Sequence, residues 1–123
     1  MSAGLLFALV LAAGVAGALL RHGAVVLFGR RERFPVVILV VNAIGSLLVG
    51  VLFGLASVIP AAWLLIGATG LCAAFTTFST FAVDTVRLAL DGRGWAAVGN
   101  LAGSIALGLG CAALGAAIAL ALV

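Results

Sequence analysis

Residues 70–81 read GLCAAFTTFSTF, and within this stretch residues 75–81 hold four hydroxyl side chains and three phenylalanines. The rest of the 123-residue chain is largely aliphatic, because 67% of all residues are hydrophobic and only 7% are charged. These values lie outside the range of soluble domains and indicate an integral membrane protein. A cluster of hydroxyls is costly in lipid unless it is buried and used. We therefore expect the chemistry of the protein at residues 70–81.

The apolar sequence on either side of this cluster divides into membrane spans. A hydrocarbon core of roughly 30 Å needs about 20 helical residues to cross it. Arginine, aspartate and proline residues separate four apolar stretches of at least that length, at about residues 3–28, 35–59, 63–90 and 95–122. These spans use nearly every residue, so we predict an all-α integral membrane protein with a single four-helix transmembrane domain, residues 1–123.

The hydroxyl cluster falls inside the third span. Consecutive hydroxyl and β-branched residues are places where a membrane helix can unwind and satisfy its backbone by other means. We therefore expect the third helix to be broken near residues 73–79. An unbroken helix is also compatible with these residues, because Thr and Ser side chains can bond to carbonyls one turn earlier.

The other spans carry isolated polar residues. Asn42 lies roughly two turns into the second span, where its amide needs partners, and a bond between helices or a place in a polar pathway would satisfy it. Arg21, near the end of the first span, must either extend to the interface or line a wet cavity. Asn100 lies near an interface and is expected to be hydrated, whereas Ser104 lies deeper.

Small residues predict where helices pack closely. Gly50 and Gly54 have the four-residue spacing that permits close crossing of membrane helices, and so do Gly99 and Gly103. Cys72 and Cys111 lie inside apolar spans without a C-x-x-C motif, so we interpret them as packing residues.

The charges predict the orientation in the membrane. The chain has six arginines and no lysine, and all six lie in residues 21–33 and 87–93. The first and third loops, which carry or border these arginines, share one side of a four-span protein. Positively charged loops remain in the cytoplasm. We therefore predict that loops one and three are cytoplasmic and that both termini lie outside.

Three motifs in the expected order resemble the Fluc/CrcB family of fluoride channels: GALLR at residues 17–21, FP at 34–35 followed by VNAIGS at 41–46, and TTFSTF at 76–81. The resemblance covers nearly the whole chain, and the last motif is the most specific. It implies a fluoride-selective channel of the plasma membrane that exports fluoride from the cytoplasm and lowers its toxicity. It also implies an antiparallel, dual-topology dimer with two narrow pores and a structural sodium ion that is not transported.

The same resemblance assigns roles to individual residues. Its paired pore phenylalanines fall on Phe78 and Phe81, and its sodium-binding backbone carbonyls fall on Ala73 and Thr76. The implied anion pathway consists of Arg21, Asn42, Phe78, Ser79, Thr80, Phe81 and Ser104.

Elementary chemistry agrees with these roles. Fluoride holds its water tightly, so a selective pathway must offer successive hydrogen-bond donors, such as amide and hydroxyl groups. A phenylalanine ring has a positive edge, and residues three apart lie on one face of a helix, so Phe78 and Phe81 can present an anion-solvating track.

The chain departs from the family pattern at two places. Ala73-Ala74 stand where the family usually has two glycines, and Val37-Ile38 stand where it usually has Gly-Thr. A backbone carbonyl can bind sodium whatever its side chain is, but alanine cannot adopt the backbone angles that are open only to glycine. Whether the broken helix keeps its sodium site is thus open at the level of sequence.

The arginine distribution favours one orientation of this chain. A homodimer of opposed subunits needs one sequence to insert both ways. We therefore expect this chain to be one half of a heterodimer whose partner is a homologous chain of opposite orientation, with a homodimer as the alternative.

Other classes of function fit the sequence less well. A small four-span multidrug exporter of the dual-topology type is the alternative, but such carriers need a membrane-embedded carboxylate in the first span, and no carboxylate precedes Glu32. A non-transporting assembly subunit is a third possibility. An enzyme is not expected, because the three carboxylates, Glu32, Asp84 and Asp91, form no nucleophile and base pair with other residues.

Overall fold

The computed structural model describes residues 1–29 and 34–123, so part of the predicted first loop, residues 30–33, lies outside the described residues. The described part consists of helices and their connections. Four helical stretches are long and apolar enough to cross a membrane: Ala3–Phe28, Val36–Gly54, Ala61–Leu90 and Gly94–Leu120. The predicted all-α, four-span fold is confirmed.

Three spans are single helices and the third is composite. The single helices are α1 (Ala3–Phe28), α2 (Val36–Gly54) and α6 (Gly94–Leu120). The third span contains α3 (Ala61–Leu65), the π-helix η1 (Ile66–Cys72), α4 (Ala73–Phe75) and α5 (Phe78–Leu90). Helix α2 ends five residues before the expected position 59, because the Val58 amide donates to the Leu55 carbonyl in a turn (2.9 Å) that leads into Pro60.

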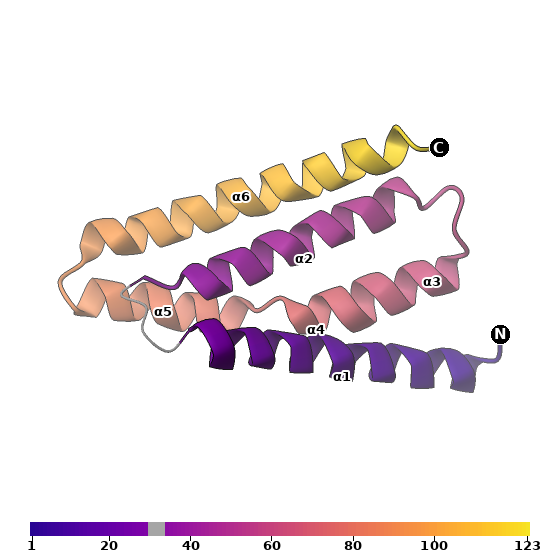
Figure 1. The fold of residues 1–123 in the computed structure, drawn as a ribbon, viewed down its shortest axis with the longest axis horizontal. Helices are drawn as coiled ribbons and strands as arrows, with labels where there is room; N and C mark the ends of the chain where they lie inside the picture. Colours follow the sequence, from indigo (N-terminus) through magenta and orange to yellow (C-terminus); the bar gives the residue numbers. More distant parts are fainter. Residues whose placement is uncertain (30–33) are drawn as a thin grey trace.

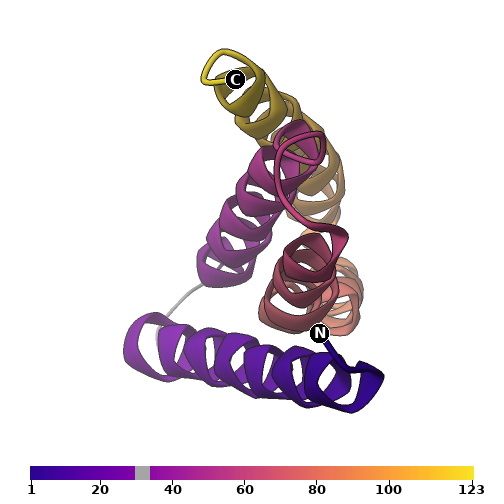
Figure 2. The same cartoon turned by 90° about the vertical axis from the view of Figure 1, so that its right-hand side faces the viewer.

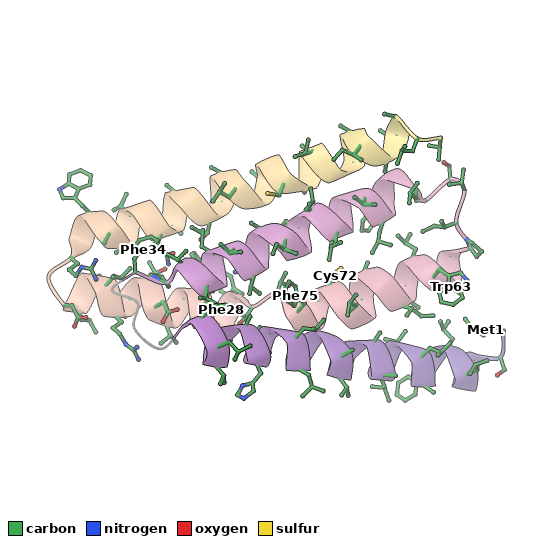
Figure 3. The ribbon with its side chains drawn as sticks, viewed as in Figure 1. Met1, Phe28, Phe34, Trp63, Cys72 and Phe75 are labelled. Carbon is green, nitrogen blue, oxygen red and sulfur yellow. The ribbon has the colours of Figure 1, made fainter. Side chains whose placement is uncertain are left out.

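The four spans run side by side (Figure 1). Both termini and the connection at residues 55–60 lie at one end, where Met1 and Trp63 are found (Figure 3), and the end of α1, the start of α2 and the connection at residues 91–93 lie at the other. Seen end on, α1 and α6 occupy opposite sides with α2 and the third span between them (Figure 2). Helix α2 packs chiefly on α6, and α1 packs on η1 and α4. The described residues that flank loop one and the third loop therefore share one end, as expected for four spans.

Helices α2 and α6 cross closely because glycines stand where they meet. A Cβ atom added to Gly50 would collide with the Ala112 carbonyl, and one added to Gly115 would lie 2.9 Å from the Val51 nitrogen. The predicted close crossing at Gly50 is confirmed. The corresponding prediction for α6 is wrong within this chain, since Cβ atoms on Gly99 and Gly103 would meet no described atom within 4 Å.

The break in the third span is confined to two residues. Helix α4 ends at Phe75, after which Thr76 (φ −76°, ψ 161°) and Thr77 (φ −148°, ψ 124°) are extended, and α5 begins at Phe78. The expected break near residues 73–79 is confirmed and is narrower than predicted. Ala73 and Ala74 lie within helix α4, and the extended angles of Thr76 and Thr77 are open to any L-residue, so this break requires no glycine.

Candidate functional site

Asn42 of α2 binds both backbone groups of Thr77 at the break. Its Nδ2 atom donates to the Thr77 carbonyl (3.0 Å), and its Oδ1 atom accepts from the Thr77 amide (2.8 Å). Thr77 is only 9% exposed, and an unpaired peptide group at membrane depth would cost several kcal/mol. Asn42 therefore replaces the helical partners that Thr77 loses. One of the two roles that the sequence allowed for Asn42, a hydrogen bond between helices, is therefore present.

Two backbone carbonyls lose their helical donors as a result of the break. In a continuous helix, the Ala73 carbonyl would accept from the Thr77 amide, but that amide donates to Asn42 instead. The Thr76 carbonyl would likewise accept from the Thr80 amide, which donates to Thr77 Oγ1 (3.3 Å). The carbonyls of Ala73 and Thr76 thus lack the amide donors that a continuous α-helix would supply, near the carboxyl-terminal, negative end of α4.

Arg21 of α1 forms a hydrogen bond with the carbonyl of Ala74, which lies between Ala73 and Thr76 in the sequence. Its Nε atom donates to the Ala74 carbonyl (3.2 Å). Helix α1 lies close enough for this bond because Gly17, one turn earlier, has no side chain, and a Cβ atom there would collide with the Leu71 carbonyl. A cation at the carboxyl-terminal end of a helix is electrostatically favourable. Arg21 therefore turns inward to the break instead of extending to the interface.

Phe78 and Phe81 begin α5 immediately after the break. Their ring centroids are 5.7 Å apart and the ring planes are inclined by 53°. Thr77 fixes this turn of helix, since its Oγ1 atom caps the Thr80 amide and also donates to Thr80 Oγ1 at 3.2 Å. Phe78 is 78% exposed, so the described residues leave most of its surface uncovered.

One cavity lies beside the break and the start of α5. It has a volume of about 420 Å³ and is bounded by α2, the break, α5 and α6. Asn42, Phe78, Phe81 and Ser104 all line it. The Ser104 hydroxyl is buried and has no hydrogen-bond partner among the described residues. The cavity thus combines two aromatic rings with an amide and an unused hydroxyl.

Comparisons with known proteins agree with this arrangement. Residues 8–116 match the family described as "CrcB-like protein, Camphor Resistance (CrcB)". This chain belongs to the CrcB family. It is 43% identical over 121 residues to the "Fluoride-specific ion channel FluC 1" of Frankia casuarinae, covering 90% of this chain and 93% of the relative. It is 45% identical over 111 residues to the "Fluoride-specific ion channel FluC 2" of Natronomonas pharaonis, covering 90% and 91% of the two chains. The chain is therefore a multi-pass membrane protein of the CrcB family.

The structure distributes the expected pathway residues of this CrcB protein over more than one place. Asn42, Phe78, Phe81 and Ser104 share the 420 Å³ cavity, whereas Arg21, Ser79 and Thr80 do not line it. The Ser79 hydroxyl lies 3.3 Å from Thr77 Oγ1. Thr80 lines a second cavity, of about 500 Å³, at the end of the bundle that holds residues 91–93. That cavity also contains the side chains of Asp84, Arg87 and Arg93.

Two polar contacts in and near the site were not predicted from the CrcB sequence. Thr77 supplies both the extended backbone that Asn42 binds and the hydroxyl that caps α5. Asn100, expected to be hydrated, is only 1% exposed and donates to Thr85 Oγ1 (2.8 Å). The expectation for Asn100 is wrong because α5 covers that face of α6. The nearly equal distances of Thr85 and Asn100 along the sequence from the 91–93 turn were the available signal.

Proposed function

We propose that this chain is a subunit of a fluoride-selective channel, which exports fluoride from the cytoplasm and so lowers its toxicity. The observation that carries the proposal is the 420 Å³ cavity in which the rings of Phe78 and Phe81 lie beside the Asn42 amide and the Ser104 hydroxyl. The relatives named above as fluoride-specific ion channels support the same function.

The donors in this cavity suit a small, strongly hydrated anion. Asn42 uses one N–H and its carbonyl oxygen on Thr77, which leaves its second N–H for an ion. The Ser104 hydroxyl has no described partner and supplies a second donor. Positive ring edges replace part of the remaining hydration shell. Chloride is larger and has to displace the rings, so selectivity for fluoride follows from the narrowness of the track.

A second subunit completes the pathway in this proposal. Phe78 is 78% exposed, and the Asn42 amide and the unpartnered Ser104 hydroxyl line the cavity beside it. These polar groups need a covering surface that is not lipid. An antiparallel second chain would place its own rings opposite those of this chain and enclose the track.

A structural sodium ion fits the break in this proposal. The acceptors are the carbonyls of Ala73 and Thr76, whose helical donors are diverted to Asn42 and to Thr77 Oγ1. Carbonyl oxygens at a helix carboxyl terminus favour a small cation. Ala73 and Thr76 would hold the ion together with their counterparts in the second chain, and the ion would fix the two broken helices to each other.

The distribution of arginine supports a heterodimer. All six arginines lie in residues 21–33 and 87–93, and the end of α1, the start of α2 and the 91–93 turn share one end of the bundle (Figure 1). We therefore propose that this end faces the cytoplasm and that the partner is a homologous chain of opposite orientation.

Topology tags test the heterodimer. A reporter fused to the carboxyl terminus should label only the outside, and arginine-free variants of the 91–93 turn should weaken this preference. Equal labelling on both sides would contradict the heterodimer and favour a homodimer.

Fluoride efflux from loaded liposomes tests the function itself. The chain is reconstituted alone and then with a homologous partner chain, and efflux is followed with a fluoride electrode. Flux in either preparation is the expected result, and absence of flux in both would overturn the proposal. The four-span exporter gains no support from the relatives, which are named as ion channels.

A further inference from the structure

A chain of two hydrogen bonds joins α6 to the backbone of Phe81. Asn100 of α6 donates from Nδ2 to Thr85 Oγ1 (2.8 Å), and Thr85 donates in turn to the Phe81 carbonyl (2.8 Å). The Thr85 hydroxyl is therefore both acceptor and donor. Asn100 is 1% exposed and does not line the 420 Å³ cavity, so its amide acts on α5 and not on an ion.

The position of this chain of bonds follows from the hairpin between α5 and α6. Thr85 and Asn100 lie at nearly equal distances from the 91–93 turn, so they face each other where two antiparallel helices pack. The Phe81 carbonyl is one turn closer to the break than Thr85, and Ser104 is one turn further along α6 than Asn100. On α6 the bonds therefore lie one turn away from Ser104, and on α5 they end at the backbone of Phe81, which lines the cavity.

Helix α5 needs such a link because the break detaches it from α4. Thr76 and Thr77 are extended, so α5 is not held in line by continuous helical hydrogen bonds, and its rotation about its own axis depends on side contacts. A rotation of α5 would move the edges of Phe78 and Phe81 relative to Ser104. A buried amide with one partner in a membrane resists such a rotation, because the alternative is an unpaired polar group.

We propose that Asn100 and Thr85 are positioning residues, which fix the rotation of α5 and so the place of the Phe81 ring edge in the anion track. Neither residue touches the ion. The inference rests on the proposed fluoride function, and it assigns the selectivity of the track partly to a polar contact outside the cavity.

Thr85→Val removes the hydroxyl with little change of volume, and Thr85→Ser retains it. In the liposome preparation in which the wild-type chain conducts fluoride, we expect Thr85→Val to lower the ratio of fluoride to chloride flux by about tenfold, the scale of one hydrogen bond to a positioned group. Thr85→Ser should keep the wild-type ratio. Thr69→Val is the matched control, because Thr69 is exposed on η1 and does not line the cavity.

A second variant and a second readout separate positioning from folding. Asn100→Ser shortens the side chain so that it no longer reaches Thr85, and it should lower the ratio as Thr85→Val does. With 4-fluorophenylalanine at position 81, Thr85→Val should shift or broaden the ring ¹⁹F resonance, while assembled protein still elutes as the wild type.

The experiment distinguishes a failure of the positioning role from a failure of the proposed fluoride function. A wild-type chain without fluoride flux, alone or with a partner, overturns the proposed function. A conducting wild type whose assembled Thr85→Val and Asn100→Ser variants keep the wild-type flux ratio overturns the positioning role, whatever the ring resonance does.

Discussion

Phe78→Ile or Phe81→Ile should abolish fluoride flux while the protein still assembles. Isoleucine retains most of the apolar volume, but it lacks the positive ring edge that solvates an anion. The rings lie 5.7 Å apart on one face of α5, so each contributes to the same short track. We expect each change to lower flux by about a hundredfold or more, which corresponds to about 3 kcal/mol at the barrier.

The control for this pair is Phe7→Ile on α1. Phe7 is exposed and does not line the cavity, so its replacement should leave fluoride efflux unchanged. Efflux from liposomes and elution on size exclusion are measured for all three variants. Wild-type flux in both Phe78→Ile and Phe81→Ile would show that the rings only pack, and would remove the central element of the proposed track.

Asn42→Leu should abolish flux and also destabilise the protein. The change removes both hydrogen bonds to Thr77 and leaves its buried amide and carbonyl without partners, at a cost of about 1–3 kcal/mol for each group. The Thr77 amide would then compete for the Ala73 carbonyl, so the break itself would change. Thermal unfolding in detergent and fluoride efflux are the measurements.

Asn42→Asp retains only the hydrogen bond from the Thr77 amide. A carboxylate can still accept from the Thr77 amide, but it cannot donate to the Thr77 carbonyl or to an anion. We expect Asn42→Asp to lose flux as fully as Asn42→Leu. Conduction at the wild-type level by either variant would contradict a role for Asn42 in the pathway.

Sequence predicted the break because its cause is local. Four hydroxyls within residues 75–81 can replace helical hydrogen bonds, and Thr77 does so by capping α5. The sequence could not show which residue binds the backbone amide and carbonyl of Thr77 at the break. Asn42 and Thr77 are 35 residues apart, and only the packing of α2 against the third span brings them together.

The wrong predictions for Gly103 and Asn100 also arise because the sequence does not show which distant segments pack together. Gly50 and Gly103 belong to equivalent small-residue motifs, yet the first meets a neighbouring backbone and the second meets no described atom within 4 Å. Spacing shows which residues share a helix face but not which neighbour that face meets. Likewise, the depth of Asn100 suggested hydration, whereas its burial depends on the α5 and α6 hairpin. The π-helix at Ile66–Cys72 has no local signal that we identified.

Parallel measurement of fluoride and chloride efflux from the same liposomes tests the central claim most directly. The chain is reconstituted alone and with a homologous partner, and both ions are followed with ion-selective electrodes under an outward gradient. The account predicts fluoride efflux that is far faster than chloride efflux in at least one preparation. Absence of fluoride efflux from both preparations, or efflux of the two ions at equal rates, would contradict it.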